Sequence, residues 1–489
     1  MKEDSVDFGY GIKSTLAQCL LLTTTYFLNV QQGIDMMMPT VIIGAMNKSR
    51  YANITDGIDV NVDDTIPSIT DEQLSWIGSL VYLTPPLGSL FLSLVQSNMG
   101  HRVCMALTNL IQFMSVVVVV MFPVTVNALY VCSMLMGLST GFATGLCISY
   151  SGEVCDPKVR SSLTSALNVF YFGGYFFITT LYAITTQWKK TLLITVAVPL
   201  INFVALSLTP DSPMWLLSKG KTDKARKTLC KLRGWETEEK CAKEFEEMVE
   251  YVSSSTTTEE PKKKTNSWIS FSHPGLWKPL KFMMIYIFFS NIMSGVPFTP
   301  YLVDIFRTYS STVDAEWATS AYMAFSMIGN IFTVLLVQRL GKRCLVQLTI
   351  AICSLCYLCI GSMDFFVVNN EYTSCAILSL FFLSAFSSSL GIMPIGWVLM
   401  SEVFPMKSKN MGCSIGSGVY FFMSFFMTKF YLDLRYWIGF NYTFVLFGAL
   451  GFSSLVYFYF FLPDTDNKTL KEINEQIQLK KLKKIKTVT

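Results

Sequence analysis

Twelve long apolar segments run through this chain of 489 residues. Hydrophobic residues make up 52% of the chain and charged residues only 15%, whereas an ordinary soluble domain contains about 25% charged residues. A helix needs roughly 20 apolar residues to cross a bilayer, so twelve crossings account for about half of the chain. Because the apolar runs are continuous rather than alternating, they predict membrane-spanning helices and exclude a closed β-barrel.

The apolar segments set the expected organisation of the chain. The predicted spans are residues 16–46, 74–95, 103–122, 129–150, 163–185, 192–208, 280–306, 317–337, 345–368, 374–400, 412–432 and 436–462. We therefore expect an all-α membrane protein with twelve transmembrane helices. The expected domains are an N-terminal six-helix bundle (1–209), a loop with short helices and a linker (210–278), a C-terminal six-helix bundle (279–462) and a tail (463–489).

Short charged motifs recur at matching places in the two halves of the chain. Gly100-His101-Arg102 follows the second span, and Gly341-Lys342-Arg343 follows the eighth. A second motif follows the fourth span with Glu153, Pro157 and Arg160, and returns after the tenth span with Glu402, Pro405 and Lys409. This repetition predicts two pseudo-symmetric halves with a substrate site between them near the membrane midplane, the plan of an alternating-access transporter.

The charges of these motifs are candidates for a gate. Glu153 with Arg160, and Glu402 with Lys409, stand at helix ends where a carboxylate and a cation can bridge neighbouring helices. Together with Arg102 and Arg343, they would hold the cytosolic side closed while the other side opens. The alternative is that these charges only mark the edge of the bilayer.

Positive charge predicts the orientation of the chain. The central loop and the C-terminal tail are rich in Lys and Arg, whereas the first loop contains only Lys48 and Arg50 beside several acids. By the positive-inside rule, both termini and the central loop face the cytosol and the first loop faces outward. That loop contains glycosylation sequons at Asn47 and Asn53, so we expect a glycoprotein of the plasma membrane.

Other function classes find little support in the sequence. The chain has only two histidines, and it shows neither a nucleophile paired with a base nor a phosphate-binding glycine loop. Cys353, Cys356 and Cys359 lie at helical spacing in an apolar span and are interpreted as small core residues. We therefore expect no enzyme, no metal, no cofactor and no nucleic-acid partner.

Signature segments between the spans resemble those of sugar porters of the major facilitator superfamily. Residues Pro210–Leu217 resemble the PESPRWL signature, and Leu462–Thr465 with Lys468–Leu470 resemble PETKGxTL. Pro394–Trp397 with Glu402–Pro405 resemble PxPW…EIFP, and Asp71–Ser79 is similar to insect facilitated trehalose and glucose transporters. The resemblance implies the major facilitator fold and a protein that works as a monomer in the lipid bilayer. The implied activity is facilitative transport of a sugar such as trehalose or glucose.

The resemblance also implies a substrate site. Family amides of the fifth and seventh spans fall on Asn168 and Asn291, and an asparagine of the eleventh span falls on Tyr420. The implied site consists of Gln32, Asn168, Asn291, Ser294, Trp397 and Tyr420. Because several family amides are replaced, a different or larger substrate is possible. The alternative role of Asn168 and Asn291 is hydrogen bonding between helices.

Asp35 lies deep within an apolar span, where a carboxylate is costly and marks a functional site by default. In the resembling family, proton-coupled symporters place an acid at this position, and the arginine that accompanies it falls here on Ser133. Without that cation, we expect the carboxyl group to be neutral much of the time. The sequence therefore favours uniport. The alternatives are proton-coupled symport of a sugar or another polar solute, and a non-transporting nutrient sensor.

Overall fold

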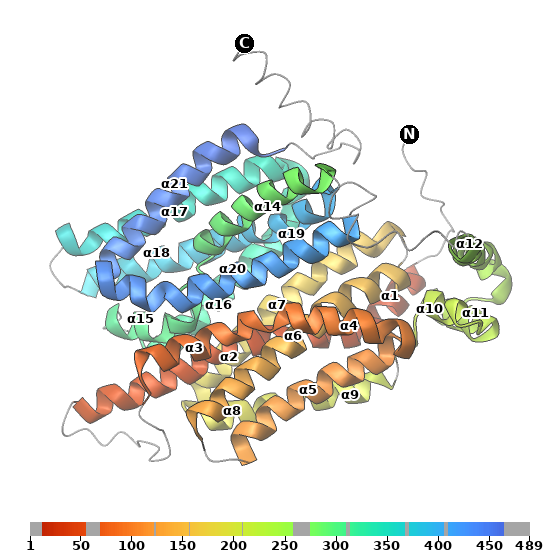
Figure 1. The fold of residues 1–489 in the computed structure, drawn as a ribbon, viewed down its shortest axis with the longest axis horizontal. Coiled ribbons are helices and arrows are strands. Elements are labelled where there is room, and N and C mark those ends of the chain that lie inside the picture. Colours follow the sequence, from red (N-terminus) through yellow and green to blue (C-terminus); the bar gives the residue numbers. More distant parts are fainter. Residues whose placement is uncertain are drawn as a thin grey trace, which may run out of the picture.

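The computed structural model describes residues 12–54, 69–121, 124–155, 157–207, 209–257, 274–309, 313–366, 371–404 and 409–463. Within these ranges every regular element is a helix. Figure 1 shows two helical bundles lying side by side, with the first half of the chain in one and the second half in the other. This arrangement confirms the predicted fold class.

The N-terminal bundle is formed by the helices of the first half. Their bounds are α1 (Ile12–Leu21), α2 (Thr23–Ile54), α3 (Asp71–Leu83), α4 (Pro85–Met99), α5 (His101–Met121), α6 (Val126–Val154), α7 (Pro157–Thr185), α8 (Trp188–Thr195) and α9 (Ala197–Leu206). Three predicted spans of this half are each divided into two helices: α1 with α2, α3 with α4, and α8 with α9. Pro85 explains the division between α3 and α4, because proline supplies no N–H and disfavours helical geometry in the residue before it.

The C-terminal bundle follows a set of short helices. Those short helices are α10 (Pro213–Ser218), α11 (Thr222–Leu232) and α12 (Glu238–Thr257). The bundle itself contains α14 (Pro274–Met293), the short η1 (Thr299–Tyr301), α15 (Leu302–Tyr309), α16 (Ala315–Leu340), α17 (Lys342–Phe366), α18 (Glu371–Leu390), α19 (Ile392–Val403), α20 (Lys409–Ile438) and α21 (Phe440–Phe461). In Figure 1, α10–α12 lie at one end of the N-terminal bundle. We call this the α10–α12 end and the opposite end the far end.

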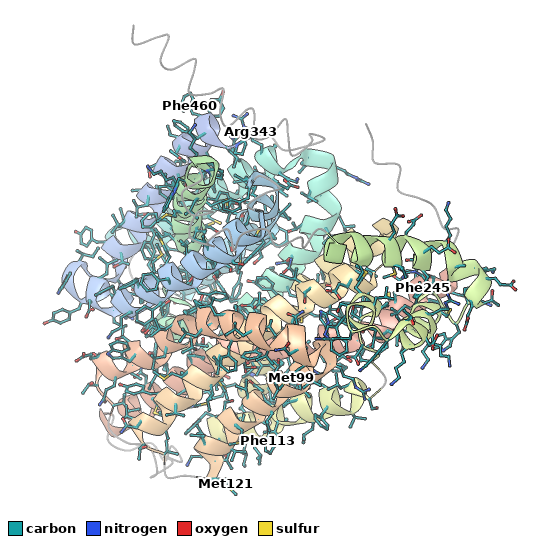
Figure 2. The ribbon with its side chains drawn as sticks, turned by 45° about the vertical axis from the view of Figure 1, so that its right-hand side comes forward. Met99, Phe113, Met121, Phe245, Arg343 and Phe460 are labelled. Carbon is teal, nitrogen blue, oxygen red and sulfur yellow. The ribbon has the colours of Figure 1, made fainter. Side chains whose placement is uncertain are left out.

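The surface of the bundles suits a bilayer. Nine helices or helix pairs among the described residues are long and apolar enough to cross a membrane. The remaining predicted spans fall on α2, α14 and α20, of which α2 contains Gln31, Gln32 and Asp35. Large apolar side chains point outward, as Met121 and Phe460 do at 76% and 63% exposure (Figure 2). Exposed apolar surface of this kind is expected where lipid covers a protein.

Small residues bring α2 and α7 into close contact. A Cβ atom added to Gly174 would lie 2.1 Å from the carbonyl oxygen of Val30, and one added to Gly33 would lie 2.1 Å from that of Tyr171. Only glycine permits this approach, which is typical of helix packing in membranes. The contact fixes the α7 residues that face the space between the two bundles.

Candidate functional site

A cavity with an empty volume of about 510 Å³ lies between the two bundles. This figure includes the open solvent at the mouth of the cavity. The N-terminal bundle contributes walls from α2, α3 and α7, and the C-terminal bundle contributes walls from the segment after α14 and from α16, α18, α19 and α20. The residues that line the cavity are Met36, Tyr82, Tyr171, Phe172, Tyr175, Ser294, Val296, Thr299, Tyr322, Met323, Ser326, Ser389, Met393, Tyr420 and Phe421.

The lining combines hydroxyl groups with apolar side chains. Five of the lining residues are tyrosines, four are Ser or Thr, and the rest are Met, Phe and Val. Among the described residues that line the cavity, none is an amide or a charged side chain. Tyr171 and Tyr175, one helical turn apart on α7, share a hydrogen bond of 2.6 Å between their hydroxyl oxygens. The cavity therefore offers hydroxyl groups and ring faces to a ligand.

Two of the residues implied by the family resemblance line this cavity, namely Ser294 and Tyr420. Trp397 is half-buried beside them, with its ring centroid 5.1 Å from that of Tyr420. Asn168 is exposed on α7 and is not one of the lining residues. The structure thus places Ser294, Trp397 and Tyr420 together and leaves Asn168 apart.

The other two implied amides take part in contacts between helices. Asn291 is fully buried, and its Oδ1 accepts a hydrogen bond of 2.9 Å from Ser424 of α20. Gln32 donates from Nε2 to the carbonyl oxygen of Thr140 at 3.1 Å and to the hydroxyl of Thr144 at 3.0 Å. These bonds agree with the alternative role of interhelical hydrogen bonding, and a direct substrate role for either amide stays a prediction.

Tyr82, Tyr171, Tyr175 and Tyr322 are cavity residues that the sequence did not single out. The four-residue spacing of Tyr171 and Tyr175 places both on one face of a helix. Their neighbours are aromatic as well, since residues 170–177 read FYFGGYFF. Spacing alone therefore could not separate these residues from ordinary lipid-facing or core aromatics.

Asp35 lies inside the N-terminal bundle rather than on the cavity wall. It is fully buried and faces Gln112 of α5 and Ser139 of α6. Neither of its carboxylate oxygens has a hydrogen-bond partner among the described residues, and the buried hydroxyl of Ser133 also lacks one. The structure therefore provides no described cation beside this carboxyl group.

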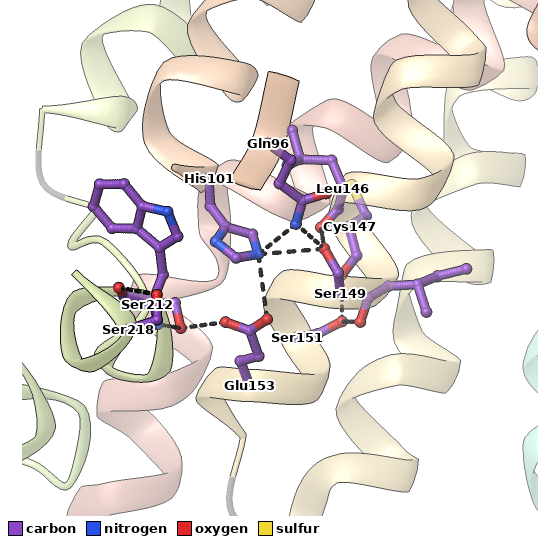
Figure 3. Close-up of polar contacts among 11 residues, drawn as sticks. Gln96, His101, Leu146, Cys147, Ser149, Ser151, Glu153, Ser212 and Ser218 are labelled. Atoms are coloured by element: carbon purple, nitrogen blue, oxygen red, sulfur yellow. Dashed lines mark hydrogen bonds and ion pairs between the residues drawn. The ribbon is translucent and has the colours of Figure 1, made fainter. Parts of the chain in front are cut away.

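The repeated motif of the first half forms a polar cluster at the α10–α12 end (Figure 3). His101 Nε2 lies 3.6 Å from Glu153 Oε1 and 2.8 Å from Gln96 Nε2. Ser212, which precedes α10, donates a hydrogen bond to the other carboxylate oxygen of Glu153. The signature segment that begins at Pro210 is thus attached to the motif by a direct bond.

The second half has a matching contact, with a lysine in the place of the histidine. Lys342 Nζ lies 2.6 Å and 2.8 Å from the two carboxylate oxygens of Glu402. Arg343 instead donates to the carbonyl oxygen of Tyr459, near the end of α21. In both halves the middle residue of the motif, His101 or Lys342, meets the carboxylate. The sequence paired these carboxylates with Arg160 and Lys409 instead, and that pairing stays a prediction.

Several residues named for the gate and for glycosylation cannot be placed in these contacts. Arg102 is exposed and makes no contact of this kind with the part of the chain that the structure describes. The side chains of Arg160, Lys409 and Asn53 lie outside the described residues. Asn47 is described, and its side-chain amide donates to Asp304 of α15.

Polar contacts join the two bundles at the far end. Lys429 of α20 donates to the hydroxyl of Ser75 on α3 at 2.5 Å, and its ammonium lies 4.6 Å from the ring centroid of Trp76. Lys48 of α2 lies 3.5 Å from Glu316 of α16, which also pairs with Arg307 at 3.2 Å. The structure is therefore that of a state in which the bundles are linked at the far end.

Comparison with known proteins extends along nearly the whole chain. The family model described as "Sugar (and other) transporter" matches residues 22–477. A facilitated trehalose transporter of Culex quinquefasciatus is 24% identical over 501 residues, which cover 98% of this chain and 90% of that protein. Another facilitated trehalose transporter, from Apis mellifera ligustica, is 25% identical over 410 residues and covers 83% of this chain and 80% of its own length.

Solved structures share the arrangement of the helices. The proton:xylose symporter XylE bound to 6-bromo-6-deoxy-D-glucose superposes with a TM-score of 0.70 at 16% identity, covering 95% of this chain and 99% of that one. The inward-open xylose transporter XylE from E. coli gives a TM-score of 0.72 at 15% identity, with coverage of 93% and 98%. At this identity the similarity shows the fold.

Proposed function

Because the chain belongs to the sugar (and other) transporter family, we propose that it moves a sugar such as trehalose or glucose across the plasma membrane by facilitated, alternating-access transport. It is a multi-pass membrane transporter with the major facilitator fold, and it is not an enzyme. The observation that supports the proposal best is the cavity, because its walls come from both bundles. Such a site can open to one side of the membrane at a time as one bundle rocks against the other.

We propose that the far end faces outward and that the α10–α12 end, with both termini, is cytosolic. The Lys- and Arg-rich composition of the central loop and tail supports this orientation. The same proposal includes the domain limits expected from the sequence, glycosylation at Asn47 and Asn53, and function as a monomer. The contacts of Lys48 and Lys429 then close the outer side in the state described here.

The cytosolic gate of this proposal uses the repeated motifs. Its residues are Arg102, Glu153, Arg160, Arg343, Glu402 and Lys409, to which we add His101 and Lys342 on the basis of their contacts. The His101–Glu153 contact and the Lys342–Glu402 ion pair each join neighbouring helices within one bundle. They would hold the helix ends in position, so that the halves can meet when the outer side opens.

The uniport form of the proposal has one competitor with a structural basis. The relatives named above are facilitated trehalose transporters, which favours uniport. The structural neighbours are named as a proton:xylose symporter, and Asp35 is an ionisable group inside a span, which proton coupling would require. A nutrient sensor that does not transport is the third possibility.

Uptake into proteoliposomes tests the proposal directly. Purified protein is reconstituted, and entry of radiolabelled trehalose and glucose is followed with and without an imposed proton gradient. We expect saturable uptake that stops when the inner and outer concentrations are equal. Protein-free liposomes are the control. If properly folded protein moves neither sugar nor any related glycoside, the transport proposal fails and the sensor is favoured.

A further inference from the structure

The cavity lacks the side chains that usually recognise a free sugar. An amide group offers both donors and an acceptor, so one amide can bind two neighbouring hydroxyl groups of a sugar, whereas a tyrosine or serine hydroxyl has a single proton to donate. Neither Asn291 nor Gln32 lines the cavity among the described residues. Asn291 accepts from Ser424 through Oδ1, and its Nδ2 has no partner in the described part of the chain, whereas Gln32 donates to a neighbouring helix. Hydrogen bonding to a ligand therefore falls to hydroxyl groups.

The tyrosines that line the cavity come from both bundles. Tyr171 and Tyr175 are hydrogen-bonded to each other, and Tyr82 and Tyr420 line the same cavity. Tyr82, Tyr171 and Tyr175 come from the N-terminal bundle, and Tyr420 comes from α20. This group can bind the hydroxyls of one sugar ring, while the aromatic faces cover its apolar C–H face.

Much of the rest of the wall is apolar, and no charge is present among the described lining residues. Met323, Met393, Phe172 and Phe421 lie there beside Ser and Thr residues, of which Ser294, Thr299 and Ser326 already donate their hydroxyl protons to backbone carbonyls. A sugar hydroxyl placed against the apolar side chains would lose its water without gaining a partner, which is unfavourable. An apolar group in the same place would instead gain by leaving water, and methionine adapts readily to its shape.

We propose that the preferred substrate is a glycoside whose sugar ring carries an apolar aryl or alkyl group, in preference to the free sugar or a fully hydroxylated disaccharide. This inference rests on the proposed function, since it narrows the substrate of the same cavity. The sugar ring binds at the tyrosine hydroxyls, and the apolar group lies against the methionine and phenylalanine side chains. Free glucose and trehalose are then transported with weaker apparent affinity.

Competition and counterflow in proteoliposomes test this preference. Phenyl β-D-glucopyranoside, D-glucose and trehalose are compared as inhibitors of radiolabelled glucose uptake. We expect the phenyl glucoside to inhibit at a concentration at least about tenfold lower than glucose, since burial of an aromatic ring supplies that difference. Vesicles preloaded with the phenyl glucoside should also accelerate entry of labelled glucose, which only a transported compound does.

Two methionines on α16 provide a matched pair of variants. Met323 lines the cavity, whereas Met327, one turn further along the helix, does not. Met323→Gln should reduce the preference for the phenyl glucoside several-fold, and Met327→Gln should leave it unchanged. Met393→Gln, on α19, is the second test if Met323→Gln does not fold.

The possible results distinguish a failure of this inference from a failure of the proposed transport function. If glucose or trehalose is transported and the phenyl glucoside competes no better than glucose, the inference is wrong and the proposed function stands. Inhibition without acceleration from preloaded vesicles also overturns it, because the compound is then a blocker. If none of the three compounds crosses the membrane, the proposed function itself fails.

Discussion

The tyrosine pair of α7 places two hydroxyl groups at the cavity wall and gives the sharpest residue-level test. Tyr171→Phe removes a hydroxyl that lines the cavity and bonds to Tyr175 at 2.6 Å. Loss of one hydrogen bond costs about 0.5–1.5 kcal/mol, so the apparent Km for the transported sugar should rise roughly 2- to 13-fold. Tyr182→Phe, on the same helix, is the control.

That control is well matched because Tyr182 is buried and its hydroxyl has no hydrogen-bond partner among the described residues. Its removal should leave both Km and expression unchanged. An unchanged Km in Tyr171→Phe as well would show that these hydroxyl groups do not contact substrate.

The ring of Trp397 packs against that of Tyr420, which lines the cavity. Their ring centroids are 5.1 Å apart at a tilt of 57°, and such a pair contributes about 0.5–1.5 kcal/mol beyond area burial. Trp397→Ala should reduce uptake by about tenfold, a loss of that size, with surface expression retained. Trp397→Phe keeps a ring and should recover much of the activity. Equal activity of the wild type and Trp397→Ala would remove this residue from the site.

The site shows where sequence reasoning at the residue scale reaches its limit. Aligned signatures placed Ser294, Trp397 and Tyr420 near the cavity, because each stands beside a recognisable segment of the chain. They could not show that Asn291 bonds to Ser424, since that contact depends on how α14 and α20 are rotated against each other. The cavity tyrosines could not be identified from the sequence for another reason. The chain has 22 tyrosines, and most of them lie in apolar spans, so nothing in the sequence distinguishes those that line a cavity.

At the scale of elements, the spans were predictable and their internal breaks were not. A continuous apolar run identifies a membrane helix by length alone. The break between α18 and α19 at Gly391 leaves the run apolar on both sides, so composition did not mark it. Likewise, the sequence assigned Glu153, Arg160 and Arg102 to one gate but could not show which residue of the Gly-His-Arg motif meets Glu153, because adjacent residues at a helix start point in different directions. Only the structure assigns the contact to His101.

A buried ion pair within the short helices α10–α12 also bonds to the end of α6. Arg233 is 3% exposed, binds Glu244 of α12 at 2.5 Å, and donates to the carbonyl oxygen of Val154 at 3.1 Å. Arg233→Met leaves Glu244 buried without its cation, so we expect a loss of about 3–5 kcal/mol in the stability of this region. The measurement is thermal unfolding of purified protein together with surface expression.

A second substitution separates the charge effect from loss of packing. In the double variant Arg233→Met with Glu244→Met, both buried charges are gone, and apolar side chains of similar length replace them. It should recover most of the lost stability. A double variant as unstable as Arg233→Met would attribute the defect to the bond with Val154 instead.

The far-end contacts should control how often the transporter opens outward. Glu316 pairs with Lys48 across the bundles and with Arg307 within its own bundle. Glu316→Gln weakens both pairs, and partly exposed pairs of this kind contribute about 0.2–1 kcal/mol each. We expect a cysteine introduced at Ser326, in the cavity, to react faster with an impermeant thiol reagent added outside. The control is Glu238→Gln, which removes a surface pair with Arg226 on the short helices and should leave that rate unchanged. An unchanged rate in Glu316→Gln would show that the far-end pairs do not restrain opening.

At the scale of the whole molecule, the open question is whether transport is coupled to protons. A coupling acid must alternate between charged and neutral forms as the bundles move. Asp35 is fully buried, both of its oxygens lack hydrogen-bond partners among the described residues, and Ser133 stands where the resembling symporters have an arginine. An uncompensated charge is expensive at this depth of a bilayer. These features favour a carboxyl group that stays neutral throughout the cycle.

Replacing Asp35 with asparagine therefore separates the two mechanisms. Asn keeps the size and hydrogen-bonding capacity of a neutral carboxyl group, so Asp35→Asn should leave equilibrative uptake and exchange nearly unchanged. Wild-type uptake should reach the outside concentration without exceeding it, and a protonophore should not slow it. Asp35→Lys is the contrasting variant, because a buried cation cannot be tolerated there and transport should be lost. Accumulation above the outside concentration at acidic external pH, present in the wild type and abolished in Asp35→Asn, would establish proton-coupled symport in place of uniport.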